Sequence, residues 1–260
     1  MVRGMERFLG HFSDYTDRYV LIGGAAVDML MDRAGIDFRL TKDFDVVLLV
    51  ESLDAEFGRA FWEFIVAGGY EHLHRSTGTP CFYRFDKPTD SSFPYMIELF
   101  ARRDGLIELP SEAVIGPLPV AEEVPSLSAI MIDDDYYGFV CDGARVIGGA
   151  PLLGATHLIP LKARAWLDLT DRRGRGEDIQ SDSIKKHRAD VVRLYQLLRP
   201  DEQVPLPPRI AEDLEAFLAR AFAGGYDPSS VGVSRTTIEE VVSTLRDVFR
   251  LRVTDRAGPE

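Results

Sequence analysis

Apolar positions in the first part of the chain come in short runs separated by glycines and charged residues, which is typical of short strands alternating with helices. The run Tyr19–Ile22 ends at a glycine pair, and an apolar-periodic segment follows over Ala25–Ala34. A second apolar run, Val46–Val50, comes next. We therefore expect a strand, a glycine turn, a helix and a second strand, preceded by a short helix within residues 1–18.

The pattern up to residue 150 predicts one more helix and several strands. A helix is expected over Asp54–Ala67, with Asp54 as its N-cap and Gly68-Gly69 at its end. Strands are predicted at Cys81–Phe85, Phe93–Phe100 and Leu127–Ile132, with a connecting segment at Leu106–Pro125 and a hairpin over Tyr136–Val146 that turns at Asp142-Gly143. Asp133-Asp134-Asp135 lacks the glycine and final glutamate of a calcium loop, so we expect a solvated turn there.

From residue 151 onward the apolar spacing is helical. Helices are predicted from a Thr156 cap to Leu169, over Ser183–Leu198, over Pro208–Ala223 and over Thr236–Leu251, with a polar loop at Arg172–Asp182 and frayed residues at the C-terminal end. We therefore expect an α+β fold with two domains. Residues 1–150 form a mixed sheet flanked by helices, and residues 151–260 form a helical bundle.

Composition places the chain among ordinary globular proteins. Its 260 residues are 45% hydrophobic and 28% charged, and no apolar run approaches the roughly 18 residues of a membrane span. Two cysteines without metal-ligand spacing, and a charged N-terminal stretch, predict a reduced cytoplasmic setting. A net charge of −12 argues against nucleic-acid binding over the whole surface. A basic stretch at residues 162–193 is either a local binding face or a solvated mixed-charge face.

Two aspartates at the start of the second strand carry the first chemical signal. Asp43 and Asp45 alternate with Phe44, so they share one face of the strand, about 7 Å apart. Such carboxylates repel each other unless a cation lies between them, and Mg²⁺ prefers oxygen ligands of this kind together with phosphates. The glycine pair, Gly23-Gly24, lets a phosphate approach the backbone at the start of a helix. The layout favours handling of a nucleoside triphosphate.

Two later residues extend this site. Glu98 lies within the apolar run 93–100, where an ionised carboxylate is costly unless it is paired or binds a metal. It is either a third metal ligand or the partner of water or of an arginine such as Arg102. Lys162 lies beside the apolar face of its predicted helix, so its ammonium either points to one place or reaches the surface.

These motifs resemble those of a known superfamily. Gly23-Gly24 with Thr41-x-Asp43-x-Asp45 resembles the signature of the nucleotidyltransferases, which have the polymerase β-like fold. Lys162, the polar loop after it and Asp190 in the next helix resemble one branch, the AbiEii-type nucleotidyltransferase toxins of type IV toxin–antitoxin systems. The sequence departs from that branch after Gly24, where Ala25-Ala26 removes a hydroxyl contact.

The resemblance implies roles for these residues. Two Mg²⁺ ions (or Mn²⁺), about 4 Å apart, would be held by Asp43, Asp45 and Glu98. The residues implied in nucleotide binding are Gly23, Gly24, Thr41, Lys42 and Lys162. Asp190 would support the catalytic site from the helical half. The reaction would move a nucleoside monophosphate from a nucleoside triphosphate to an RNA such as tRNA, or to a protein, and a cognate antitoxin would be a partner.

Two other functions stay open at this point. One is an antibiotic-type small-molecule nucleotidyltransferase, since an acidic protein suits a cationic acceptor. The other is a nucleotide-binding or regulatory protein of the same fold that catalyses nothing.

Overall fold

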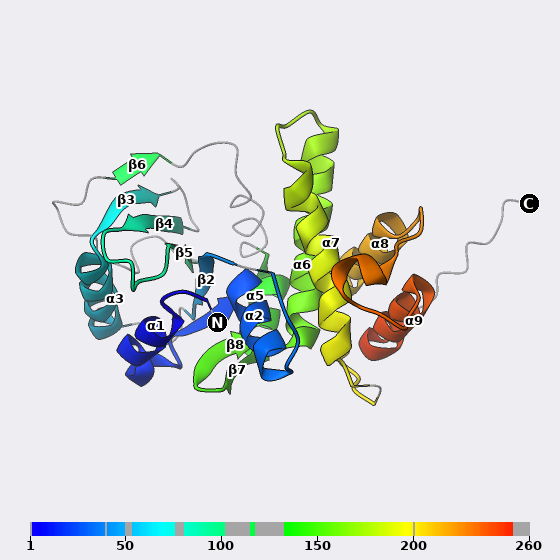
Figure 1. Ribbon diagram of the computed structural model, residues 1–260, viewed down its shortest axis with the longest axis horizontal. Coiled ribbons are helices and arrows are strands. Elements are labelled where there is room, and N and C mark those ends of the chain that lie inside the picture. Colours follow the sequence, from blue (N-terminus) through cyan, green and yellow to red (C-terminus); the bar gives the residue numbers. More distant parts are fainter. Residues whose placement is uncertain are drawn as a thin grey trace, which may run out of the picture.

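The computed structural model describes residues 2–39, 41–49, 54–75, 81–101, 115–117, 133–199 and 201–251. The predicted strand Leu127–Ile132, most of the connecting segment Leu106–Pro125, the C-terminal residues from 252 onward and Arg102 lie outside the described residues. Figure 1 shows the arrangement of the helices and strands in the described residues.

One mixed sheet forms the centre of the described chain. Its strand order is β6-β3-β4-β5-β2-β1-β8-β7. The strands are β1 (Tyr19–Ile22), β2 (Asp43–Leu48), β3 (Tyr70–Arg75), β4 (Cys81–Pro88), β5 (Met96–Ala101), β6 (Ile115–Pro117), β7 (Ala144–Ile147) and β8 (Ala150–Leu153). Strand β2 is antiparallel to β1 and parallel to β5, while β1 is parallel to β8.

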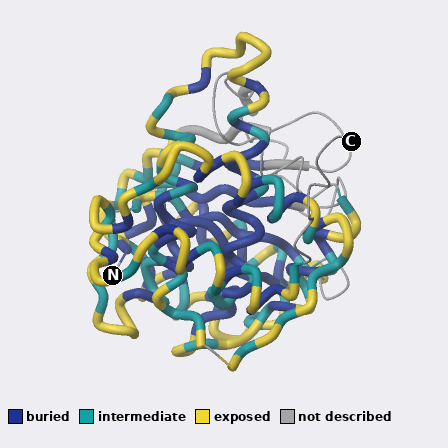
Figure 2. Tube along the Cα trace, turned by 90° about the vertical axis from the view of Figure 1, so that its right-hand side faces the viewer, coloured by how far each residue is buried: buried dark blue, intermediate teal, exposed yellow. Residues whose placement is uncertain are grey.

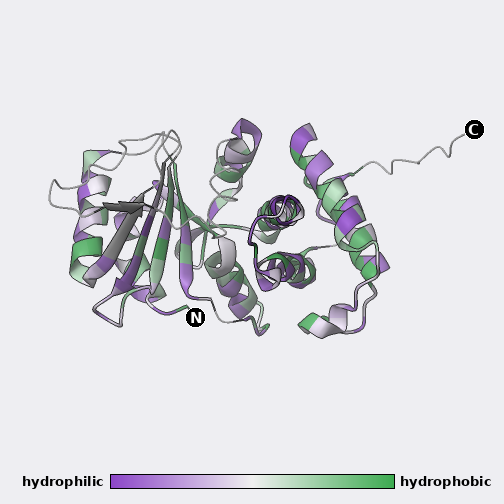
Figure 3. Ribbon diagram, turned by 90° about the horizontal axis from the view of Figure 1, so that it is seen from above, coloured by the Kyte–Doolittle hydropathy of each residue, from purple (hydrophilic) through white to green (hydrophobic). Residues whose placement is uncertain are grey.

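Helices cover both faces of this sheet, and further helices extend the molecule on one side. The α-helices are α1 (Met5–His11), α2 (Gly23–Arg33), α3 (Ala55–Gly68), α5 (Asp134–Gly143), α6 (Ala155–Gly174), α7 (Ser181–Leu194), α8 (Pro208–Ala221) and α9 (Ile238–Phe249). Helix α3 lies at one face, α2 and α5 lie at the other, and α6 to α9 follow beyond them (Figures 1 and 3). The α+β fold with a helical C-terminal part, expected from the apolar pattern, is therefore confirmed.

An aromatic core on the α3 face fixes the orientation of β2. The ring of Phe44 lies 5.5 Å from that of Phe8 in α1, which in turn lies 5.5 Å from Phe64 in α3. Buried residues gather in the interior of the molecule (Figure 2). Because side chains alternate along a strand, burying Phe44 toward α1 and α3 directs its two neighbours to the opposite face.

The predicted hairpin at residues 136–146 is wrong. Residues 134–143 form helix α5, and Asp133 is its N-cap, because the Asp133 carboxylate accepts hydrogen bonds from the backbone N–H groups of Asp135 and Tyr136. The three aspartates are therefore a helix start rather than a solvated turn. The hairpin lies later, between β7 and β8, where Gly148 and Gly149 take positive φ angles of 61° and 84°.

Several boundaries also differ from the prediction. Strand β3 was not anticipated, and Phe93 precedes β5 rather than belonging to it. The N-cap of α6 is Gly154 rather than Thr156, and α6 continues to Gly174, which shortens the polar loop before α7.

The predicted cap of α3 is confirmed, because Asp54 accepts from the Phe57 N–H. At α9, Thr237 and Glu240 form a capping box. Within the described residues, no helix has the length and apolar character needed to cross a bilayer. The division into two domains at residue 150 stays a prediction; strand β8 begins at that residue.

Candidate functional site

The strand pairing brings the acidic residues together. In the parallel pairing of β2 with β5, Asp45 lies directly beside Glu98, and neighbouring strands are about 4.8 Å apart. The two side chains therefore share the face of the sheet that looks toward α2. Both residues are largely buried, with exposed fractions of 8% for Asp45 and 6% for Glu98. Asp43 lies two residues before Asp45 on the same face and is half-buried.

The glycine pair lies against these carboxylates. Gly23 has a φ of 65°, and a Cβ placed on it would lie 1.6 Å from Oδ2 of Asp45. A Cβ on Gly24 would lie 2.6 Å from Oγ1 of Thr41. Side chains at these positions would collide with Asp45 and Thr41, so glycine is required for this close approach. The prediction of a separate glycine turn is wrong, because helix α2 begins at Gly23 itself.

A cleft of about 720 Å³, counting space open to solvent, lies where these elements meet. Its lining is Ile22, Gly23, Gly24, Arg39, Thr41, Asp43, Asp45, Glu98, Leu158, Leu161, Lys162, Ala165, Lys186 and His187. Carboxylates and cations therefore line the same solvent-open cleft.

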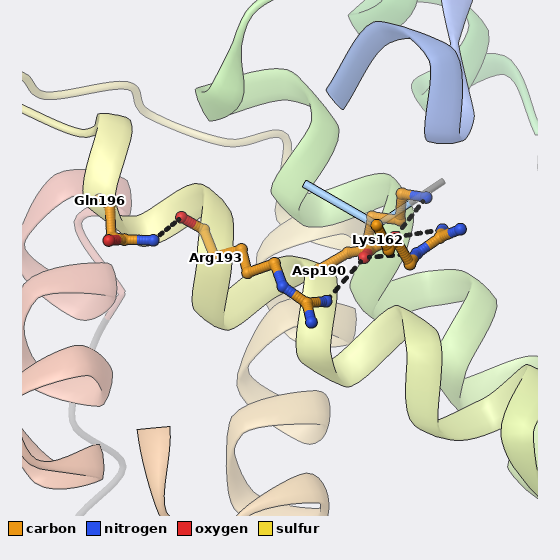
Figure 4. A network of polar contacts seen from close by, with 5 residues as sticks. Lys162, Asp190, Arg193 and Gln196 are labelled. Atoms are coloured by element: carbon orange, nitrogen blue, oxygen red, sulfur yellow. Dashed lines mark hydrogen bonds and ion pairs between the residues drawn. The ribbon is translucent and has the colours of Figure 1, made fainter. Parts of the chain in front are cut away.

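Lys162 reaches this cleft from α6 on the side facing the sheet. It is 6% exposed, and its Nζ lies 3.0 Å from Oδ2 of Asp190 in α7. The ion pair explains why a lysine is stable on the apolar side of α6. The structure thus brings Lys162 of α6 and Asp190 of α7 into direct contact (Figure 4).

Glu98 is tied to an arginine on the adjacent strand. Nε and Nη2 of Arg84 in β4 donate to Oε1 of Glu98 at 3.1 and 2.9 Å. Burial and the neighbouring Asp45 raise the pKa of Glu98 well above its usual range, although Arg84 opposes this shift. The sequence left two roles open for Glu98, a metal ligand or the partner of water or an arginine. The structure shows pairing with an arginine, and this arginine is Arg84. Arg102 lies outside the described residues.

The carboxylates suit a hard divalent cation in donor chemistry. Asp45 and Glu98 are adjacent, and burial, followed by the charge of Asp45, raises the pKa of Glu98; a cation beside them would favour the ionised form of both carboxylates. As they stand, the described residues present no group of three or more His, Cys, Asp or Glu side chains arranged to hold an ion. Arg84 holds one Glu98 oxygen by two hydrogen bonds.

Arg39 and His187 also line the cleft, although neither was predicted as a site residue. Arg39 precedes Thr41 by two residues and lines the cleft beside Gly24. His187 is 7% exposed, and burial followed by the charges of Lys162 and Lys186 lowers the pKa of His187 well below its usual value, so the ring is neutral. Arg39, Thr41 and Asp43 occupy every second position, and this alternation indicates that Arg39 faces the same side as the aspartates. No local pattern indicates a comparable role for His187.

Lys42, predicted to bind the nucleotide, is not among the residues that line the described cleft. It is exposed, and its Nζ lies 5.8 Å from the ring centre of Tyr95. Alternation along the chain explains this position, because Lys42 lies between Thr41 and Asp43, which face the cleft. Lys42 does not contribute to the cleft in this structure.

Comparison with known proteins adds little to this picture. No protein-family model and no curated protein sequence matches the chain. Among solved structures, an antigenic nucleotidyltransferase-like protein from Paracoccidioides brasiliensis matches with 14% sequence identity and a TM-score of 0.42, over 95% of this chain and 94% of that one. The function of the chain is therefore inferred from the cleft itself.

Proposed function

We propose that the chain is a metal-dependent nucleotidyltransferase, which moves a nucleoside monophosphate from a nucleoside triphosphate to an acceptor and releases pyrophosphate. One observation carries the proposal. A single cleft has carboxylates on the sheet side, cations on the side of α6, and the glycine start of α2 among its walls. Carboxylates suit Mg²⁺ and cations suit phosphates, so this arrangement fits a metal-bound triphosphate better than either ligand alone.

The residues of the chain act by positioning and by charge. Backbone N–H groups at Gly23 and Gly24 begin α2 and offer donors to phosphate oxygens. The ammonium of Lys162 lies on the α6 side of the cleft and stabilises the negative charge that develops on the leaving pyrophosphate. The hydroxyl of Thr41, beside Gly24, is within the same cleft and supplies a further polar contact.

Asp43, Asp45 and Glu98 would hold Mg²⁺ or Mn²⁺, which, when bound, neutralises triphosphate charge and lowers the pKa of an attacking hydroxyl. Glu98 accepts hydrogen bonds from Arg84 on Oε1 and also interacts with Asp45. An ion would take the place of the Asp45 interaction and relieve the repulsion among the three carboxylates.

The acceptor is proposed to be an RNA such as tRNA, or a protein, with the chain acting as the toxin of a toxin–antitoxin pair. Support comes from the paired motifs around Asp43 and Lys162, which resemble the AbiEii-type toxins. A cognate antitoxin would then be a partner. The net charge of −12 favours a second candidate, transfer to a cationic small molecule.

The direct test is incorporation of label. The protein is incubated with each α-labelled nucleoside triphosphate and Mg²⁺ or Mn²⁺, separately with total RNA, a protein extract and a set of cationic small molecules. Label in RNA or protein supports the toxin proposal, and label in a small molecule supports the second candidate. Triphosphate binding without label transfer to any acceptor would leave a non-catalytic nucleotide-binding protein and overturn the enzyme.

Replacing Lys162 with alanine is expected to raise the KM for the triphosphate about tenfold, because a charge-assisted contact to phosphate is lost. Asp190 keeps its contacts with Arg39 and Arg193, so the fold is expected to persist. Initial rates at varied triphosphate concentration measure the effect. The control is Lys185→Ala, since Lys185 is exposed and pairs with Asp182 at the surface. A KM for Lys162→Ala equal to that of the control would place Lys162 outside the nucleotide site.

A further inference from the structure

One buried carboxylate holds two cations of the cleft. Asp190 is 0% exposed, and its Oδ2 lies 3.0 Å from Nζ of Lys162 and 2.9 Å from Nη2 of Arg39. Nε of Arg39 also donates to Oδ1 at 3.2 Å. Arg39 and Asp190 are 151 positions apart in the chain. Asp190 therefore connects helices α6 and α7 to the segment that precedes β2. Strand β2 itself carries Asp43 and Asp45.

Asp190 has a third cationic neighbour. Nη1 of Arg193 lies 3.5 Å from Oδ1 of Asp190, so three cations surround one carboxylate (Figure 4 shows Lys162, Asp190 and Arg193). Burial raises the pKa of Asp190, but Lys162 and Arg39 outweigh it and hold the pKa far below its usual range, so Asp190 is ionised. Arg39 and Lys162 line the cleft, and Arg193 is not among its lining residues.

Arg39 lies close to the start of helix α2. Its Nη2 is 3.6 Å from the position that a Cβ on Gly24 would take. Helix α2 has 11 residues, and the N–H groups of its first turn have no partners within the helix. A guanidinium and the positive end of a helix thus meet in one part of the cleft. Both attract an anion, and they do so beside the lysine of α6.

We propose that Arg39 binds the polyphosphate of the nucleoside triphosphate together with Lys162, and that Asp190 is the positioning residue that holds both cations. This inference rests on the proposed function and adds a substrate preference to it. A planar guanidinium matches two phosphate oxygens at once, whereas an ammonium acts as a point charge. Two separate cations gain most from a chain of several phosphates, so the site selects a triphosphate over a monophosphate.

The test measures binding without metal or turnover. Inorganic tripolyphosphate and orthophosphate are titrated into the full chain by calorimetry in the presence of EDTA. The wild-type protein is expected to bind tripolyphosphate more tightly than orthophosphate. Arg39→Ala is expected to weaken tripolyphosphate binding about tenfold or more, the loss of a charge-assisted hydrogen bond. Arg39→Lys keeps a charge beside Asp190 and is expected to be intermediate, and it serves as the second variant if the alanine variant is unstable.

Arg193→Ala is the matched control, because it removes a cation from the same carboxylate but outside the cleft. Its tripolyphosphate affinity is expected to stay within about twofold of wild type. Equal losses in Arg39→Ala and Arg193→Ala would overturn the proposal, since Arg39 would then act only by holding Asp190. Unchanged affinity in Arg39→Ala would overturn it as well.

The two proposals fail in different ways. If tripolyphosphate binding depends on Arg39 but no label is ever transferred, the phosphate site stands and the transferase does not. If label is transferred and Arg39→Ala keeps the wild-type KM for the triphosphate, the transferase stands and the role of Arg39 does not.

Discussion

Replacing Asp45 with asparagine is expected to lower the rate of nucleotidyl transfer about a thousandfold or more, because charge stabilisation by a bound metal is worth several kcal/mol. Asp45 is the carboxylate nearest to both other parts of the site. It lies beside Glu98 across the sheet and against Gly23 at the start of α2. Asparagine keeps the shape of the side chain, so Gly23 still fits, but it removes the charge.

The fold is expected to survive this change. Burial, followed by the charge of Asp45, raises the pKa of Glu98, so Asp45→Asn removes a negative charge that disfavours the ionised form of Glu98. The measurement pairs the rate of label transfer with thermal unfolding of the same samples. Asp182→Asn is the control, because Asp182 is an exposed aspartate on α7. A folded Asp45→Asn protein with the wild-type rate would show that Asp45 is not part of the catalytic site.

The acidic side of the cleft could be predicted from local sequence. A strand alternates its side chains, so the order Asp43-Phe44-Asp45 fixes one aromatic side chain on one face and two carboxylates on the other. The aromatic core confirms that orientation through the contact of Phe44 with Phe8. A glycine pair at the end of β1 is likewise a local signal. Ile22 pairs with Asp45 in the antiparallel ladder of β1 and β2, and this pairing brings Gly23 close to Asp45.

The partners of the buried charges could not be predicted in this way. The Arg84–Glu98 pair depends on β4 lying beside β5 in register, and the Arg39–Asp190 pair joins segments 151 positions apart. Such contacts are set by tertiary packing, which local periodicity does not contain. The mistaken hairpin at residues 136–146 has a related cause. Asp142-Gly143 is a turn signal in isolation, but burial of Tyr136 and Val140 at helical spacing decides the structure.

The charge of Asp190 is expected to contribute the largest single effect on stability. Replacing it with asparagine leaves Lys162 and Arg39 without their carboxylate, and breaking a buried ion pair in this way costs about 3–5 kcal/mol. Urea unfolding at pH 7 measures the loss. Lys162→Met combined with Asp190→Asn is expected to recover part of it, because one stranded cation is removed. Asp182→Asn again serves as the exposed control.

The penalty for Asp190→Asn also has a defined pH dependence. The pKa of Asp190 is lower in the folded protein than the value of about 3.9 in an unfolded chain. Its stabilising contribution is therefore fully present above pH ~4 and declines as the pH falls toward the folded pKa. The pKa of Glu98 is raised in the folded protein, so its contribution to stability has the opposite pH dependence and is lost as the pH rises. Glu98 is present in both wild type and Asp190→Asn, so its contribution cancels in the difference between their unfolding free energies. That difference is expected to be constant from pH 6 to 8 and to shrink below pH ~4. A difference that grows as the pH falls would show that Asp190 is not held as an anion by Lys162 and Arg39.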